Sequence, residues 1–288
     1  MEVAYKPASL EEALNIVEER NAIPLAGGTD LMVHRRSWSG LPPRFEHPVV
    51  FIGHLDALIG IELEDGILSI GAANTLTSIL EHREIPPLLR ASIRQIAGPA
   101  IRNRATIGGN ICNASPAADT LPAFYVLGAE AVLVSTAGTR VVPIEKFIEG
   151  PGKTCLRRGE LLSRIRVPAD RHDIWFFRKV GTRAAYSCSK LSLAAVAHTE
   201  KGLAAEVRLA LGSIAPTVIR SREAEAFMRA KTAGEIDTHL PRILEYYDSL
   251  IDPIDDQRSS AAYRRDASLR LVRYFIRNIL LPHIEGTM

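Results

Sequence analysis

Two glycine-rich stretches constrain this chain more than any other feature of its sequence. The first is Pro24-Leu25-Ala26-Gly27-Gly28-Thr29-Asp30-Leu31, and the second runs from Ala105 to Asp119. Each combines a glycine pair with hydroxyl and amide side chains and an aspartate. Glycine lets the backbone turn sharply and lets its N–H groups approach a ligand closely. We therefore expect the two stretches to wrap one extended, phosphate-bearing cofactor.

The first stretch does not match the common nucleotide-binding motifs. Gly27-Gly28 follows a short apolar strand expected over residues 22–26 and precedes a helix that Thr29 or Asp30 can cap. It lacks the third glycine of GxGxxG, and no acid ends a second strand about 20 residues further on, so a Rossmann NAD site is not expected. The chain has no Gly-Lys-Ser/Thr, which excludes a P-loop.

The second stretch concentrates donors and acceptors beside an apolar helix. Its polar side chains are Thr106, Asn110, Asn113, Ser115 and Asp119. The carboxylate of Asp119 is able to accept from a ribose or ribityl hydroxyl, and Asn110 and Ser115 suit a pyrophosphate or a flavin edge. The alternative is a turn in which the Asn and Ser side chains satisfy one another.

Composition limits the class of protein. With 288 residues, the chain is long enough for more than one domain. Its formal net charge of +2 gives no polyanion-binding signal, so we expect no nucleic-acid partner. We expect the local basic runs Arg102-Asn103-Arg104 and Arg264-Arg265 to be solvated faces.

The sequence carries no membrane, secretion or metal signal. No stretch approaches the ~20 apolar residues that span a bilayer, and the N-terminal residues lack a signal-peptide pattern. Cys112, Cys155 and Cys188 are far apart and odd in number, so they form no disulfide framework and no CxxC metal pair. We expect a cytoplasmic protein with no membrane span and no metal of its own.

Strands and helices are segregated along the chain, which predicts an α+β fold. We expect three parts: residues 1–55 and 56–170, with a helix over 86–97, and residues 171–288. Ser9 and Glu12 form a capping-box pattern before a helix. The last part is predicted to have a three-stranded antiparallel sheet over 174–179, 191–198 and 204–211, followed by helices over 221–230, 233–249 and 260–280.

Several motifs in order resemble those of one family. They are the two glycine stretches themselves, Ile96-Ala97-Gly98-Pro99-Ala100-Ile101-Arg102-Asn103, Phe177-Arg178-Lys179-Val180-Gly181-Thr182-Arg183, and Asp256-Gln257-Arg258-Ser259-Ser260-Ala261-Ala262-Tyr263-Arg264. Together they resemble the FAD-binding medium subunit of the molybdenum hydroxylases, the xanthine dehydrogenase and carbon monoxide dehydrogenase family. The resemblance implies a two-part FAD-binding domain of the vanillyl-alcohol-oxidase-like (PCMH) type, followed by a C-terminal flavoprotein domain.

The resemblance also implies an FAD held between the first two parts. Its diphosphate would lie on the backbone N–H groups of Ala26 to Asp30 and near Thr106 and Asn110. Asp119 would bind a hydroxyl of the FAD chain, and Ile96 and Leu162 would flank the isoalloxazine. The full set of implied cofactor-binding residues is Leu25, Ala26, Gly27, Gly28, Thr29, Asp30, Leu31, Ile96, Ala97, Ile101, Ala105, Thr106, Gly109, Asn110, Asn113, Ser115, Asp119, Leu161, Leu162 and Lys179.

Two positions near the implied flavin ring are candidates for tuning it. Lys179 matches a family lysine that approaches the ring, where a cation favours the anionic reduced flavin. The alternative for Lys179 is a surface lysine. Many relatives carry an acid after the arginine that matches Arg183, whereas this chain has Ala184-Ala185-Tyr186-Ser187. We hypothesise that Tyr186 instead gates access to the flavin.

The resemblance implies an electron-transfer oxidoreductase subunit. Electrons would come from a large molybdopterin-binding subunit through a small subunit with two-iron two-sulfur clusters, and FAD would pass them to NAD⁺ or another acceptor. The resemblance implies a heterotrimer able to dimerise. The Cys-bearing insertion of the benzoyl-CoA-reductase branch is absent after Asp119, so we expect no iron in this chain. Two alternatives are a free-standing flavin oxidase of the same fold and a flavin-free assembly subunit.

Overall fold

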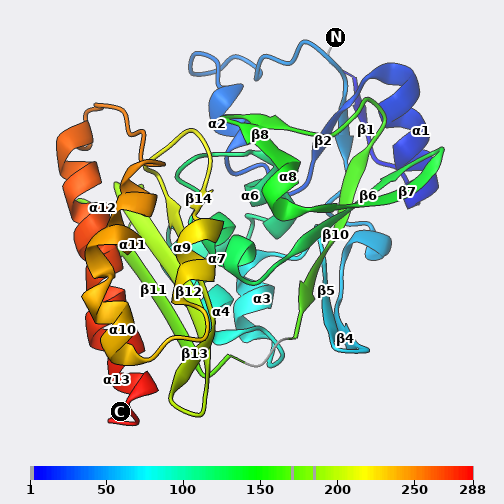
Figure 1. Ribbon diagram of the computed structural model, residues 1–288. Coiled ribbons are helices and arrows are strands. Elements are labelled where there is room, and N and C mark those ends of the chain that lie inside the picture. The colour runs from blue at the N-terminus through cyan, green and yellow to red at the C-terminus, as the bar shows by residue number, and fades with distance from the viewer. Residues whose placement is uncertain (1–2, 170–171, 184–185, 288) are drawn as a thin grey trace. The chain divides into compact units, whose positions relative to one another are not determined.

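The chain folds into two compact units that do not follow chain order. The computed structural model describes residues 3–169, 172–183 and 186–287. Unit 1 comprises residues 1–85, 97–115 and 129–168, and unit 2 comprises residues 86–96, 116–128 and 169–288 (Figure 1). The three-part division at 55 and 170 remains a proposal, and residues 170–171 lie outside the described residues.

Unit 1 combines a small parallel sheet with a larger antiparallel sheet. Its strands are β1 (Ala4–Tyr5), β2 (Ile23–Leu25), β3 (Val49–Phe51), β4 (Ile61–Glu64), β5 (Ile67–Gly71), β6 (Glu130–Ser135), β7 (Gly138–Pro143), β8 (Ile148–Gly150), β9 (Lys153–Thr154) and β10 (Leu161–Pro168). Its helices are α1 (Leu10–Arg20), α2 (Leu31–His34), α3 (Leu76–Glu81), α5 (Pro99–Arg102), α6 (Ile107–Cys112) and α8 (Ile144–Phe147), with a 3-10 turn η1 (Asp56–Leu58). The parallel sheet has the order β1-β3-β2, the antiparallel sheet has the order β4-β5-β10-β6-β7, and β8 pairs with β9.

The predicted capping pattern starts α1. The hydroxyl of Ser9 accepts from the N–H of Glu12 at 3.1 Å, as expected, while the carboxylate of Glu12 accepts from the N–H of Ala8 at 2.7 Å. Leu14 and Val17 then lie on one face of the helix and pack against the core that contains Val50 of β3. The capped helix therefore packs against the parallel sheet through this core.

Unit 2 is an antiparallel sheet with helices. Its strands are β11 (Ile174–Val180), β12 (Leu191–Glu200), β13 (Leu203–Gly212) and β14 (Ile219–Arg220), in the order β11-β12-β13-β14. Its helices are α4 (Pro87–Arg94), α7 (Thr120–Val126), α9 (Arg222–Met228), α10 (Ala233–Thr238), α11 (Leu240–Asp248), α12 (Ala261–Phe275) and α13 (Leu281–Ile284), with a π-helical turn η2 (Ile276–Leu280). The α+β prediction and the three predicted strands are confirmed, and the short β14 adds a fourth strand.

The central strand β12 is buried on both faces. Leu191, Leu193 and Ala195 belong to the core that also contains residues of α9 to α13. Ser192 faces the other way and lies beside Gly212, where an added Cβ would meet Pro122 of α7 and the Ser192 hydroxyl, each at 2.8 Å. Burial on both faces explains why β12 is nearly all apolar rather than alternating.

Two predicted helices are interrupted at prolines. The helix predicted over 233–249 breaks at His239 into α10 and α11, because Pro241 has no N–H and its ring excludes the carbonyl of Asp237. The helix predicted over 260–280 ends its α-helical part at Phe275. The chain continues as the π-helical turn η2 and then as α13, which contains Pro282. Because Pro282 has no N–H, it cannot donate to the carbonyl of Asn278 as an α-helical residue would.

The Asp256–Arg264 motif ties the start of α12 to the sheet of unit 2. The carboxylate of Asp256 accepts from the N–H groups of Arg258 and Ser259, and the guanidinium of Arg264 lies 2.7 Å from it. The same guanidinium donates to the carbonyls of Lys190 and Ser213. Arg264 is only 4% exposed, so its predicted role as a solvated face is wrong.

We expect Asp256→Asn to make the stability of the fold depend less on pH between about pH 2 and pH 4. Burial raises the pKa of the Asp256 carboxyl, but the two N–H groups and Arg264 more than offset this and hold that pKa at about 2, below the ordinary 3.8. A lowered pKa stabilises the fold above about pH 4, and this contribution is lost as the pH falls toward 2. Thermal denaturation from pH 2 to pH 6 measures it. Parallel curves for the variant and the parent chain would contradict the assignment.

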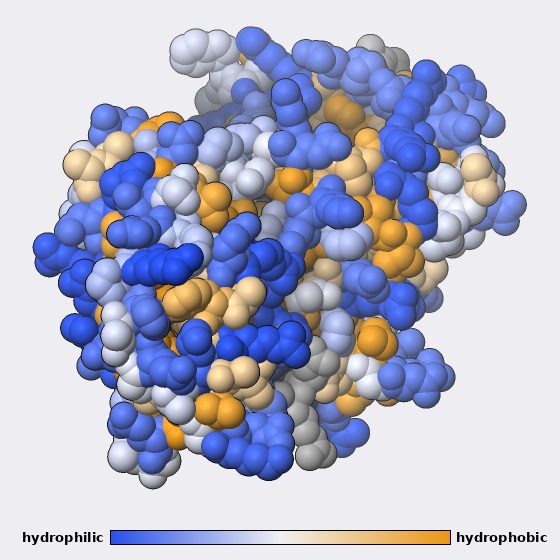
Figure 2. Space-filling model, viewed as in Figure 1, coloured by the Kyte–Doolittle hydropathy of each residue, from blue (hydrophilic) through white to orange (hydrophobic). Residues whose placement is uncertain are grey.

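The surface gives no sign of a bilayer-spanning helix. Among the described residues, no helix is long and apolar enough to cross a membrane. On the face shown in Figure 2, apolar residues occur in small groups among hydrophilic ones. Scattered apolar groups of this kind are normal on a folded protein and need no partner to explain them.

Candidate functional site

The first glycine stretch passes against the second with no room for a side chain. A Cβ added at Gly27 would lie 2.1 Å from the carbonyl oxygen of Arg104 and 3.1 Å from the Cα of Ala105. Gly53, which follows β3, has a similar role, since its Cβ would lie 3.2 Å from the backbone of Ala26. Gly28 is required for a different reason, because its φ is +73°. These glycines allow three segments of unit 1 to meet.

The same stretch presents backbone donors without acceptors. Within the described part of the chain, the N–H groups of residues 27–31 donate to no protein oxygen. The expected cap is only partly formed: Asp30 stands at the start of α2 but accepts no capping bond, and its carboxylate lies 3.1 Å from Nε2 of His34. N–H groups that lack protein acceptors are suited to a ligand with several oxygens.

The second stretch contains one helix and ends at Asp119, where the next helix begins. Residues 107–112 form α6 and residues 120–126 form α7. The hydroxyl of Thr106 caps α6 by accepting from the N–H of Gly109 at 3.1 Å. Gly108 is required by close packing, because its Cβ would lie 2.6 Å from the Cβ of Ala72. The glycine pair therefore lies in the capped first turn of α6, and this helix was not predicted from the sequence.

Two helix caps lie side by side in unit 1. Thr75 caps α3, and it forms an isolated antiparallel bridge with Thr106. The N–H of Leu76 donates to the carbonyl of Ala105, and the N–H of Ile107 donates to the carbonyl of Asn74. Each threonine oxygen accepts from its own helix and keeps its hydroxyl proton available for donation.

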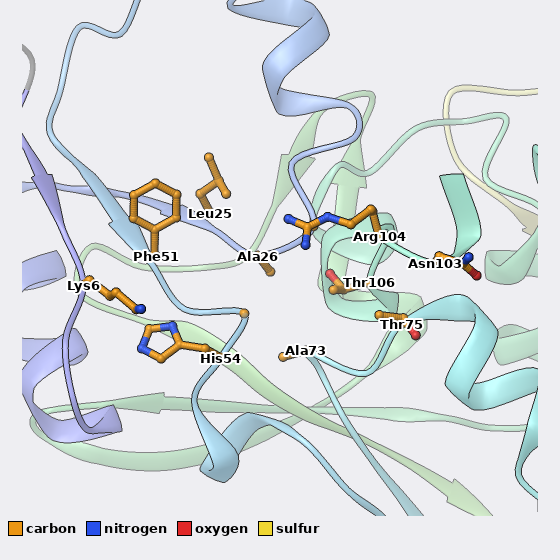
Figure 3. A pocket seen from close by; sticks show the side chains of 12 residues that line it. Lys6, Leu25, Ala26, Phe51, His54, Ala73, Thr75, Asn103, Arg104 and Thr106 are labelled. Carbon is orange, nitrogen blue, oxygen red and sulfur yellow. The ribbon is translucent and has the colours of Figure 1, made fainter. Parts of the chain in front are cut away.

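A pocket of about 480 Å³ forms where these features meet, within unit 1 (Figure 3). Leu25, Ala26, Gly27 and Thr106 were predicted to bind the cofactor, and all four line it. The other residues that line the pocket were not predicted as site residues. Most of them lie at or just after the end of a strand, and the rest lie in or beside a motif already described. These other lining residues are Lys6, Phe51, Gly53, His54, Ala73, Thr75, Asn103 and Arg104.

The pocket is cationic. Lys6 and Arg104 line it and no acidic side chain does. Arg104 is exposed, as expected for a solvated residue, but its side chain also lines the pocket and points toward Ala26 in Figure 3. Nε2 of His54 lies 2.8 Å from the carbonyl of Pro7, which assigns the ring proton to that nitrogen. Cations, hydroxyls and backbone N–H groups together form a donor set for an anion.

Unit 2 contains a separate buried charge cluster. Nζ of Lys179 lies 2.6 Å from Oδ2 of Asp119 and donates to the carbonyl of Gln95 at 3.0 Å. The hydroxyl of Ser189 donates to the other carboxylate oxygen of Asp119. The two charged side chains are 8% and 4% exposed, so Lys179 is not a surface lysine.

Burial raises the pKa of the Asp119 carboxyl, and the ammonium of Lys179 and the hydroxyl of Ser189 oppose that rise. When both groups are ionised, the charge of Lys179 is compensated at 2.6 Å. The cluster then acts on its surroundings as a dipole rather than as an isolated cation. Any effect of Lys179 on a flavin would therefore be smaller than that of an isolated cation.

The other predicted residues occupy varied environments. Leu161 and Leu162 are buried in β10, and Leu161 packs against Leu14 of α1. Ala97 has a φ of +43°, which is strained for alanine. Ile101 is 43% exposed and Tyr186 is 60% exposed. Residues 184–185 lie outside the described residues. Asn113 is exposed, whereas Ile96, Asn110 and Ser115 are half-buried. Their roles remain predictions.

The three cysteines are unpaired thiols. Burial raises the pKa of the Cys112 thiol to about 12, so it is a packing residue rather than a reactive one. Among the described residues, no three His, Cys, Asp or Glu side chains gather in a way that suits a metal ion.

The fold and the pocket define a class of protein. A cationic, glycine-walled pocket at the carboxyl ends of parallel strands is typical of a protein that binds a nucleotide cofactor. Residues 1–170 match the family described as the FAD binding domain in molybdopterin dehydrogenase, and residues 176–279 match the CO dehydrogenase flavoprotein C-terminal domain. The chain therefore belongs to this family of FAD-binding oxidoreductase subunits, and the predicted FAD cofactor is confirmed.

Individual relatives support the same assignment over nearly the whole chain. A putative xanthine dehydrogenase FAD-binding subunit of Escherichia coli (strain K12) is 34% identical, over 96% of this chain and 94% of its own. Carbon monoxide dehydrogenase from Hydrogenophaga pseudoflava matches with a TM-score of 0.84 and 26% identity, covering 94% of each chain. Quinoline 2-oxidoreductase from Pseudomonas putida 86 also has a TM-score of 0.84, with 25% identity, covering 100% of this chain and 98% of that chain.

Proposed function

We propose that the pocket of unit 1 holds the diphosphate region of FAD. The observation that carries this is the row of N–H groups over residues 27–31, which donate to no described protein oxygen and stand where Gly27 leaves no space for a side chain. The hydroxyls of Thr75 and Thr106 line the same pocket. The donor set fits a group with many oxygens and negative charge, as the FAD diphosphate is.

In this proposal the chain is the electron-relaying subunit of a molybdenum hydroxylase complex. A large molybdopterin-binding subunit and a small subunit with two-iron two-sulfur clusters are its partners. FAD, when bound, supplies two-electron redox chemistry between those clusters and NAD⁺ or another acceptor. The support is the similarity to a xanthine dehydrogenase FAD-binding subunit and to carbon monoxide dehydrogenase over nearly the whole chain. Asp119, Lys179 and the remaining predicted contacts stay proposals for substitution experiments.

The purified full chain is expected to bind one FAD that acid releases intact. The measurement is a visible absorption spectrum, followed by acid precipitation and chromatography of the supernatant against FAD, FMN and riboflavin. Release by acid reports non-covalent binding, since the donor set forms no covalent bond. Co-purification with a large molybdopterin protein and a small iron–sulfur protein tests the complex.

Two outcomes contradict the proposal separately. A chain that takes up no flavin from excess FAD would be an assembly subunit instead. A chain that binds FAD and oxidises an organic substrate rapidly without any partner would be a free-standing flavin oxidase. Mixing the reduced, FAD-loaded chain with NAD⁺ under anaerobic conditions identifies the acceptor, because reoxidation then depends on NAD⁺ alone.

A further inference from the structure

The pocket of unit 1 lies where three parallel strands end. Lys6 follows β1, Ala26 follows β2 and Gly53 follows β3. In parallel sheets, ligands bind beyond the carboxyl ends of the strands, because the loops there converge. The side chain of Lys6 and the ring of His54 lie near each other on one side of the pocket, and Arg104, which directly precedes the second stretch, points toward Ala26 (Figure 3).

Both cations of this pocket lack a protein counter-charge. Within the described residues, neither the ammonium of Lys6 nor the guanidinium of Arg104 makes an ion pair or a side-chain hydrogen bond. Some other arginines of unit 1 are paired: Arg140 lies 2.6 Å from Glu160, and Arg83 lies 2.9 Å from Glu84. Both side chains are exposed, and an anion in this acid-free pocket would be attracted by both of them through solvent.

The position of Arg104 gives it a further advantage. Its own carbonyl is the oxygen that Gly27 approaches, so its backbone is fixed against the stretch that presents the unpaired N–H groups. Its guanidinium offers a planar fork of donors that matches phosphate oxygens in pairs. Gly27 and Arg104 therefore line one pocket from two segments of the chain.

We propose that Arg104, assisted by Lys6, is the counter-charge for the FAD diphosphate and makes this chain select dinucleotide over phosphate-free flavin. The inference rests on the proposed function. It assigns a specificity role to two residues outside the glycine stretches, and it predicts that ADP alone binds this pocket because the recognised group is the diphosphate.

The test measures dissociation constants for the full-length chain from which flavin has been removed. FAD and riboflavin are followed by flavin fluorescence, and ADP is followed by calorimetry. Arg104→Gln is expected to weaken FAD and ADP about tenfold and to leave riboflavin unchanged, since a charge-assisted contact to phosphate is lost. Lys6→Gln is expected to have a smaller effect in the same direction, and Arg104→Lys to retain part of the affinity.

The control is Arg83→Gln, which removes an exposed and already paired arginine of the same unit. Added salt should weaken FAD binding to the parent chain more than to the double variant R104Q/K6Q. Equal loss for riboflavin and FAD would overturn the proposal, as would wild-type FAD affinity in the double variant. If ADP binds with this dependence but FAD does not, the diphosphate assignment stands and the proposed function fails. If neither binds the parent chain, both fail.

Discussion

Replacing Gly27 with alanine is expected to lower the FAD affinity of the full chain by about a hundredfold or more. The new Cβ would lie 2.1 Å from the carbonyl oxygen of Arg104 and 3.0 Å from its carbonyl carbon. Both atoms are backbone, so no side chain can rotate away, and the two glycine-bearing segments must separate. A misplacement near 1 Å costs about a hundredfold in rate at a catalytic site, and we expect a loss of similar size in affinity here. Overpacking also costs stability, by about 1–3 kcal/mol.

The matched control is Gly150→Ala in the same unit, where an added Cβ meets nothing within 4 Å and φ is not positive. This variant should bind FAD as the parent chain does. Fluorescence titration with FAD and thermal denaturation without ligand separate loss of binding from loss of folding. Wild-type affinity in Gly27→Ala would mean that the contact between the two segments plays no part in cofactor binding.

The fold was largely predictable because its strongest signals are local. Ser9 with the apolar spacing of Leu14 and Val17 specifies α1, and Thr75 specifies the start of α3. The run from Leu191 to Ala197 specifies a strand buried on both faces. The breaks at His239 and Phe275 were also implicit in Pro241 and Pro282, but long apolar periodicity outweighed them in the prediction.

Site residues were predictable from the sequence only where they belong to a motif. Gly27 and Thr106 were identified from their stretches, but the reason for Gly27 is a close approach to Arg104, which is distant in sequence. Lys6 and Arg104 belong to no recognisable binding motif. In the sequence, a basic residue that lines a pocket cannot be distinguished from one on an ordinary surface. The pairing of β1, β2 and β3 brings Lys6 to the pocket, and the close approach of Gly27 to the backbone of Arg104 brings that arginine there.

The second stretch shows how the same residues supported a wrong local structure. The glycine pair beside Thr106 predicted a sharply turning stretch, and glycine is also unfavourable in a helix interior. The cap from Thr106 and the packing of Gly108 on Ala72 outweigh that intrinsic preference. Tertiary packing of this kind involves residues far apart in sequence and cannot be read from a single stretch.

Replacing Asp119 with alanine is expected to destabilise unit 2 by about 3–5 kcal/mol, because it leaves the buried ammonium of Lys179 without its counter-charge. Lys179 would keep only the carbonyl of Gln95, and the hydroxyl of Ser189 would lose its acceptor. The free energy of unfolding, measured by urea denaturation of the full chain without ligand, reports the loss. Asp266→Ala removes an exposed pair with Arg270 in the same unit and should cost less than about 1 kcal/mol.

The double variant Asp119→Leu with Lys179→Met distinguishes a structural ion pair from a general packing defect. Removing both charges and filling the space with apolar groups avoids the unpaired ammonium, so most of the stability lost in Asp119→Ala should return. If the double variant is as unstable as the single one, then the side-chain volume rather than the charge pairing holds this region together. Because neither measurement requires flavin, the stability role of the pair is separated from any role in cofactor binding. A further FAD titration of the stable double variant then shows whether the buried charges also contribute to affinity.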